Sequence, residues 1–312
     1  MKYNQPIEKL EGMYTALITP MRKGDGLANP IDFDKLCMLV EDQIAAGVDG
    51  LLVAGTTGQS PTLNVMEQVH LAKIVSQAAA GRTQLMVGAG SNCTREAIEL
   101  SRQVEKTIGP TTFLHVTGYY NNPPPAGQYE HYMRVADAVE GNIILYNIPG
   151  RTASRIDLET TLKLAEHPKI IGIKDATGDI KYTQEVISKT GPSNFRVLSG
   201  NCNQTADMIQ AGGYGVISAT ANIAPKLFME LTHTALEGDF KRASELKERA
   251  NKLVDAVFTV KSPIPLSYIF RTEVRLPLVI LDKAKPEAMK MIDDVLAEFS
   301  TEELGIDLSK YK

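Results

Sequence analysis

The sequence predicts a (β/α)8 TIM barrel of the α/β class, followed by a C-terminal helical domain. Eight short apolar runs recur along the chain, and stretches with helical periodicity separate them. The runs are continuous rather than alternating, which is typical of strands buried on both faces of a parallel sheet. A doubly wound sheet is the main alternative, but eight strand–helix units over about 235 residues fit the barrel better.

The predicted strands begin about 20 to 37 residues apart, which leaves room for a helix and two loops in each unit. They are short, apolar and rich in residues that favour strands. The eight strands are predicted over residues 13–19, 50–55, 84–90, 111–117, 142–148, 170–174, 195–199 and 215–220.

The stretches between the strands show the period of amphipathic helices. Residues 32–46 carry one apolar face and end at Gly47. Residues 94–108 carry another, and we expect the hydroxyl of Thr94 to cap the start of this helix. Similar patterns predict helices over residues 126–139, 157–166, 179–189, 203–211 and 225–236.

Strand signals stop after Gly238. We therefore expect a catalytic barrel over residues 1–238 and a helical domain over residues 239–312. The second part is predicted to hold two or three helices, because prolines interrupt its helical patterns. These prolines are Pro263, Pro265, Pro277 and Pro286.

Composition and charge exclude several classes of protein. The 312 residues include 33 Lys and Arg and 37 Asp and Glu, giving a net charge of -4, which argues against binding nucleic acid by phosphate neutralisation. No apolar run approaches the roughly 20 residues of a membrane helix. Residues 1–12 are polar and lack the apolar core of a signal peptide. We therefore expect a cytoplasmic protein.

The cysteines and histidines give no sign of a metal site. Cys37, Cys93 and Cys202 lie far apart in the sequence, as expected for reduced thiols rather than a disulfide framework. The five histidines are equally scattered, with no spacing typical of metal ligands. The sequence therefore predicts no metal.

The sixth predicted strand places Lys174 at its carboxyl end, where the active site of a barrel lies. An ordinary lysine has a pKa near 10.4, and burial lowers that pKa because it disfavours the ammonium. A neutral amine there could attack a ketone and form a Schiff base. Taken alone, however, a strand-end lysine more often pairs with a carboxylate.

Other predicted strands also end in polar residues. The turn Gly55-Thr56-Thr57-Gly58 offers hydroxyls and backbone N–H groups that could hold a carboxylate. Tyr146 could donate and accept protons, and Arg151 could bind a carboxylate through two hydrogen bonds. Tyr119 and Tyr120 precede a run of prolines, which suggests a shaped loop or a subunit contact. Each of these residues alone also allows a purely structural role.

Six motifs in this order resemble the dihydrodipicolinate synthase family of pyruvate-dependent Schiff-base lyases, over about residues 11–300. They are GTTG, TGYYN, YNIPGRT, GIKDATGD, LSGN and GVISATAN. The resemblance implies condensation of pyruvate with L-aspartate 4-semialdehyde to 4-hydroxy-tetrahydrodipicolinate, in diaminopimelate and lysine synthesis. It also implies a homotetramer or homodimer and no metal or organic cofactor, because the lysine itself supplies the electron sink.

The resemblance also assigns roles to individual residues. Lys174 matches the Schiff-base lysine, and Tyr146 matches the proton donor and acceptor. Thr56 and Tyr120 match the other members of a proton relay, with Tyr120 reaching in from a neighbouring subunit. The remaining matches are Thr57 and Ile217 as pyruvate contacts, Arg151 as the partner of the semialdehyde's carboxylate, and Ser60, Asn92, Glu96 and Tyr119 as parts of an allosteric lysine site.

A few positions depart from the family pattern. Gln59 stands where a glutamate is common, so any charge contributed there is lost, and Gly118 replaces a frequent proline. Val65 and Gln68 occupy positions that are histidines in some lysine-sensitive members.

Three other functions remain open from the sequence. Sialic acid lyases share the lysine and the tyrosine, but they typically carry a serine at the position of Thr56. Aldolases of 2-keto-3-deoxy sugar acids can keep GTTG, although Arg151 favours a small carboxylated aldehyde over a polyol. A non-catalytic paralogue that binds keto acids is the alternative outside the enzymes.

Overall fold

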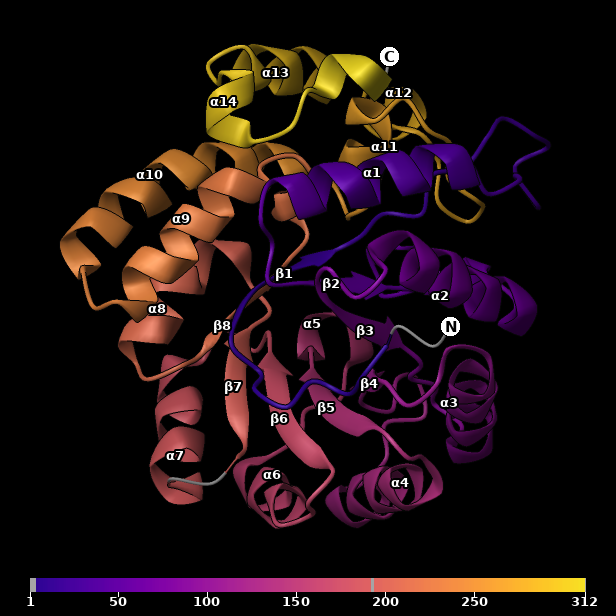
Figure 1. The fold of residues 1–312 in the computed structure, drawn as a ribbon, viewed down its shortest axis with the longest axis vertical. Helices are drawn as coiled ribbons and strands as arrows, with labels where there is room; N and C mark the ends of the chain where they lie inside the picture. Colours follow the sequence, from indigo (N-terminus) through magenta and orange to yellow (C-terminus); the bar gives the residue numbers. More distant parts are fainter. Residues whose placement is uncertain (1–3, 192–193, 312) are drawn as a thin grey trace.

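Eight parallel strands close into a barrel in the computed structural model, which describes residues 4–191 and 194–311 (Figure 1). Strands adjacent in the chain are adjacent in the sheet, and the first strand also pairs with the last. All eight predicted strands are confirmed, although six end one to three residues earlier than predicted. The strands are β1 (Gly12–Ala16), β2 (Gly50–Val53), β3 (Gln84–Gly88), β4 (Thr112–Val116), β5 (Asn142–Asn147), β6 (Ile170–Asp175), β7 (Arg196–Ser199) and β8 (Gly215–Ser218).

Helices surround the barrel and follow the strands in turn (Figure 1). Each helix predicted with bounds is present, and a further one, α2, begins at a capping box formed by Asn64 and Glu67. These helices are α1 (Phe33–Ala45), α2 (Val65–Ala79), α3 (Thr94–Ile108), α4 (Pro125–Ala138), α5 (Pro149–Thr152), α6 (Leu158–Ala165), α7 (Ile180–Thr190), α8 (Thr205–Gln210) and α9 (Pro225–Leu236).

The predicted cap at Thr94 is wrong. Cys93 occupies the N-cap position of α3 without a side-chain hydrogen bond, and Thr94 is already helical. Its hydroxyl oxygen instead lies 3.0 Å from Nδ1 of His131 on α4. The hydroxyl therefore joins two neighbouring helices rather than capping its own.

The interior of the barrel is filled by side chains that point inward from the strands. They form one buried cluster of Tyr14, Ala16, Leu52, Met86, Leu114, Ile144, Tyr146, Ile171, Leu198 and Ile217, joined by Ile7 and Leu10. This packed interior leaves space for chemistry only above it, at the carboxyl ends of the strands.

The N-terminal segment closes the opposite end of the barrel. The backbone N–H of Ile7 donates to Oγ1 of Thr112 at 2.8 Å, and the Asn142 amide donates to the carbonyl of Ile7 at 2.9 Å. Leu10 is buried beside Gly172 of β6, where a Cβ atom would lie 2.7 Å from Cδ2 of Leu10. A glycine is therefore required there for the segment to pack against the strand.

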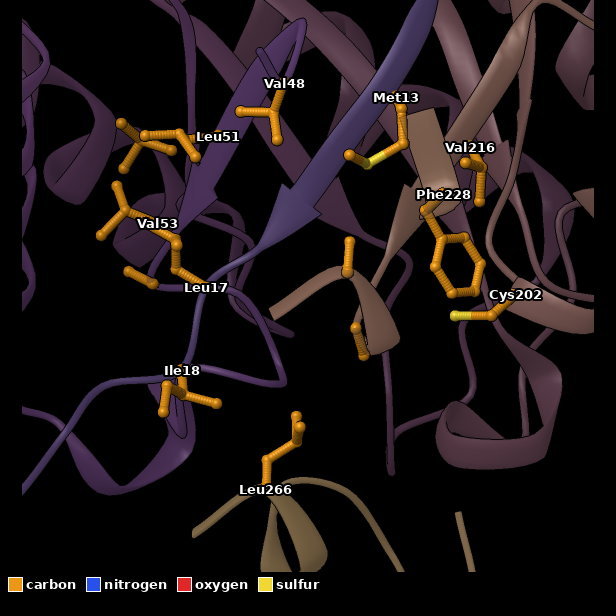
Figure 2. Close-up of a cluster of buried hydrophobic side chains, with 14 of the residues drawn as sticks. Met13, Leu17, Ile18, Val48, Leu51, Val53, Cys202, Val216, Phe228 and Leu266 are labelled. Atoms are coloured by element: carbon orange, nitrogen blue, oxygen red, sulfur yellow. The ribbon is translucent and has the colours of Figure 1, made fainter. Parts of the chain in front are cut away.

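A second, larger hydrophobic cluster lies between the strands and the surrounding helices. Figure 2 shows part of it, where Met13 and Val216 from the sheet lie near Phe228 of α9. Leu266, from the C-terminal part of the chain, belongs to the same cluster. The C-terminal helices and the barrel thus share one continuous core.

The C-terminal region is helical as predicted, but it contains more helices than the expected two or three. They are α10 (Phe240–Val257), α11 (Ile264–Ile269), α12 (Leu281–Ala284), α13 (Glu287–Leu296) and α14 (Thr301–Leu304). The error arose because the prolines were treated only as breaks. Pro263 and Pro265 stand at the start of α11 and Pro286 at the start of α13, where the missing N–H costs no hydrogen bond.

Figure 1 shows these helices grouped beside α1 and α9. Within the described part of the chain, every helix is too short or too polar to cross a bilayer.

We predict that Gly172→Ala lowers the free energy of unfolding by about 1–3 kcal/mol, because its Cβ would overlap the carbonyl oxygen of Arg196 and crowd Leu10. Gly127→Ala is the matched control. Its Cβ would make only ordinary contacts, so the change should be neutral or stabilising by up to about 1 kcal/mol. Thermal and urea unfolding measure the free energy of unfolding of both variants. Equal stability of the two variants would contradict the account of the closed end.

Candidate active site

A cavity of about 280 Å³ opens at the carboxyl ends of the strands. Strand-end positions from several strands converge there, as the barrel topology requires. Seven of the residues to which the resemblance assigns a role line this cavity, as does Gln68: the seven are Thr56, Thr57, Ser60, Tyr146, Arg151, Lys174 and Ile217. Tyr119, Tyr120, Asn92 and Glu96 lie outside its lining.

Lys174 points into the barrel because the pairing of β6 with β5 shifts at Ile171, which is left without a partner. After this irregularity, Gly172 and Lys174 face the interior and Ile173 packs in the outer cluster. The Lys174 side chain is only 6% exposed, and its register partner on β5 is Tyr146. The next residue, Asp175, accepts hydrogen bonds from the hydroxyls of Thr177 and Thr183. No ion pair involves Lys174 in the described ranges, so the alternative of a structural lysine paired with a carboxylate is not observed.

Burial lowers the pKa of Lys174 from 10.5 to about 8. The main cause is desolvation, because burial removes most of the solvent contact that would stabilise the ammonium. Cys202 opposes this shift and the positive charge of Arg151 adds to it, both with smaller effects than burial. About a quarter of the Lys174 side chains are therefore neutral at pH 7.5, compared with about one in a thousand for an ordinary lysine.

Tyr146 lies directly against this amine. The Lys174 Nζ atom is 4.3 Å from the centre of the Tyr146 ring. Burial raises the pKa of Tyr146 to about 12, although the positive charge of Arg151 and the nearby Thr56 hydroxyl act in the opposite direction. The phenol is therefore neutral near pH 7 and can donate its proton, while Thr56 provides the next hydroxyl along.

The turn after β2 brings Thr56 and Thr57 to the cavity. Ala54 adopts a left-handed conformation with φ of 55°, which is strained for a residue with a side chain. Its carbonyl packs against Gly88 of β3, where any side chain would collide with it. Gly88 thus makes room for the turn.

Arg151 lies in the short helix α5 and faces the C-terminal region. Its Nη2 atom donates to the carbonyl oxygen of Ser262 at 3.4 Å. The end of α10 and the segment after it also line the cavity, through Val254, Asp255, Phe258 and Ser262. The sequence analysis missed these residues because nothing local links a C-terminal helix to the strand ends.

Residues after β7 were also missed. Gly200, Asn201 and Cys202 line the cavity, and a Cβ at Gly200 would lie 3.2 Å from Cε of Lys174. Their position directly after a predicted strand was the available signal. Gly200 leaves space for the lysine side chain to extend.

Gln59, noted as a departure from the family pattern, lies outside the cavity lining. It is 3% exposed, and its Oε1 accepts a hydrogen bond from the backbone N–H of Arg275 at 3.1 Å. The Arg275 guanidinium in turn pairs with Glu67 on α2 at 2.6 Å. The neutral amide therefore ties the turn after β2 to the C-terminal region rather than adding charge to the cavity.

The loop after β4 is at the surface. Tyr120 is 95% exposed with φ of 70°, and Tyr119 is 38% exposed. The Asn92 amide donates to the carbonyl of Tyr119 at 3.2 Å, and Glu96 accepts from Ser91. Within one chain, this loop does not bring Tyr120 to the cavity.

We predict that Lys174→Met stabilises the protein at pH 7 by about 3 kcal/mol, the cost of holding a buried ammonium. Below pH 8, the pKa in the folded state, the lysine is charged in both states and the full cost of burying the ammonium is present. Above pH 10.5, the pKa in the unfolded state, the lysine is neutral in both states and the cost disappears. The gain from the substitution should therefore shrink as the pH rises through this window. Urea unfolding at several pH values measures it, and a gain independent of pH would contradict the assigned pKa.

Comparisons with known proteins agree with this geometry. A model of the dihydrodipicolinate synthetase family matches residues 9–293. The 4-hydroxy-tetrahydrodipicolinate synthase of Nitrosomonas eutropha is 39% identical over 285 residues, which cover 89% of this chain and 96% of the relative. The dihydrodipicolinate synthase structure from Aquifex aeolicus has a TM-score of 0.88 at 35% identity, covering 96% of this chain and all of that one.

A chloride-inhibited dihydrodipicolinate synthase from Acinetobacter baumannii has a TM-score of 0.85 at 36% identity. The match covers 91% of this chain and 98% of that one. The resemblance seen in the six sequence motifs is thus confirmed across nearly the whole barrel. The chain belongs to the dihydrodipicolinate synthetase family.

Proposed function

We propose that this chain condenses pyruvate with L-aspartate 4-semialdehyde to form 4-hydroxy-tetrahydrodipicolinate, through a Schiff base on Lys174. The observation that carries the proposal is the buried, partly neutral amine of Lys174 lying against the Tyr146 ring. Its relatives are named for this synthase activity. The structure from Acinetobacter baumannii was solved as a complex with pyruvate, which agrees with the first substrate.

In the first half of the reaction, the neutral Lys174 amine attacks the ketone carbon of pyruvate. Water leaves, and an iminium joins the substrate to Nζ. The iminium draws electrons from the pyruvate methyl group, which then loses a proton and leaves an enamine. Tyr146 and Thr56, whose side chains both line the cavity, can carry the protons that these steps move.

In the second half, the enamine carbon attacks the aldehyde carbon of the second substrate and forms the new carbon–carbon bond. The amino group of that substrate then attacks the iminium carbon, closes the ring and displaces Lys174. Thr57 and Ile217 are the proposed contacts for pyruvate, and both are buried in the cavity lining. Arg151 is the proposed partner of the semialdehyde's carboxylate, because its guanidinium lies at the cavity and carries no ion pair in the described chain.

We further propose that a second copy of the chain completes the proton relay with Tyr120. Within one chain this large aromatic side chain is 95% exposed and lies outside the cavity lining. Exposed aromatic residues on a shaped loop are typical of protein interfaces. A dimer, alone or within a tetramer, would cover Tyr120 and carry it to the neighbouring site.

We expect borohydride to trap pyruvate on this protein, because reduction converts the iminium into a stable secondary amine. Intact mass spectrometry should show a gain of one reduced pyruvate per chain, and peptide mapping should place it on Lys174. Lys174→Ala should abolish the gain. Lys181→Met, which removes an exposed lysine on α7, is the matched control and should keep it. A parent protein without any gain would instead indicate a non-catalytic keto-acid binder.

The shared relay predicts that two defective variants restore each other. When Lys174→Ala and Tyr120→Phe are produced together, a mixed dimer contains one site with both native residues. If chains assort at random, activity should recover to about a quarter of the parent level, well above either variant alone. Steady-state assays of the purified mixture measure this recovery. Activity no higher than the average of the two variants would show that Tyr120 acts within its own chain or not at all.

A further inference from the structure

We propose that Asp255 binds the ammonium group of the second substrate and so selects an amino aldehyde. The proposal rests on the proposed function and names a specificity residue for it. Among the described residues that line the cavity, Asp255 is the only carboxylate. It comes from the C-terminal helix α10, outside the barrel that carries the lysine.

The location of Asp255 follows from how α10 ends. Its neighbour Val254 is buried, whereas Asp255 and Phe258, which lie three residues apart on one helix face, are exposed at the cavity. The chain then continues to Ser262, whose carbonyl accepts a hydrogen bond from Arg151. This contact anchors the C-terminal segment to the same part of the cavity as the arginine.

Asp255 has no cation of its own in the part of the chain that the structure describes. The three cations nearest to it along α10 are Lys247, Arg249 and Lys252, and each pairs with another acid: Asp207, Glu303 and Glu298, respectively. Asp255 therefore lines the cavity without an ion-pair partner among the described residues, and a bound cation would supply one.

The two fixed charges at this cavity match one class of second substrate. An α-amino acid carries a carboxylate and an ammonium on the same carbon, which suits a guanidinium and a carboxylate on the same small cavity. The proposed second substrate, an amino acid with an aldehyde at its far end, fits this pair. A sugar-derived aldehyde carries no ammonium, so it would leave Asp255 without a partner and bind less well.

The test compares two aldehydes that differ only in the ammonium group. L-Aspartate 4-semialdehyde is the substrate, and succinic semialdehyde, which has hydrogen in place of the ammonium, serves as a competing inhibitor. Asp255→Asn should lower kcat/KM for the substrate about tenfold, because one charged contact is lost. It should leave the inhibition constant of succinic semialdehyde unchanged, and Asp255→Glu should recover part of the activity.

Controls separate this proposal from the proposed function. Borohydride trapping of pyruvate should be equal in the parent and in Asp255→Asn, which also shows that the variant folds. Glu248→Gln removes an exposed carboxylate two turns earlier on α10 and should change neither constant. If Asp255→Asn leaves kcat/KM unaltered, or weakens both aldehydes equally, the ammonium contact is wrong although the lyase chemistry stands. If the parent traps no pyruvate, the proposed function itself fails.

Discussion

The desolvation of one amine is the constraint on which the rest of this structure depends. Lys174 sits on β6 above a packed barrel interior, with the Tyr146 ring 4.3 Å from its Nζ atom. Water is excluded from below by the inward side chains and at the far end by the N-terminal segment. Burying Lys174 therefore lowers the free energy of unfolding by about 3 kcal/mol near neutral pH, and it makes the amine a nucleophile.

The other features of the site follow from the need to keep Lys174 partly uncharged. Pairing with a carboxylate would stabilise the charged form of Lys174, and the adjacent Asp175 accepts hydrogen bonds from two threonine hydroxyls instead. The fixed charges proposed for the substrate, Arg151 and Asp255, line the same cavity, and Arg151 donates to the carbonyl of Ser262 in the segment after α10. The C-terminal helices therefore do more than cover the barrel: they form one wall of the proposed substrate site.

The sequence was sufficient to predict the strands and the site residues at their carboxyl ends. Parallel strands in a barrel converge at one face, so Lys174, Tyr146 and Arg151 could be grouped before any coordinates were known. The failures were long-range. Gln59 bonds to Arg275, 216 residues away, and Asp255 reaches the cavity from a helix with no local signal. The predicted helix cap at Thr94 was wrong for a similar reason, because the Thr94 hydroxyl bonds to a residue on a neighbouring helix.

The most direct measurement of the central claim is an NMR titration of the Lys174 side chain in the native protein, with Lys174→Met used to assign the signal. The account predicts a midpoint near pH 8, the pKa that burial imposes. A midpoint near 10.5, the value of an ordinary lysine, would mean that the amine stays charged and hydrated, and the Schiff-base mechanism would lose its physical basis.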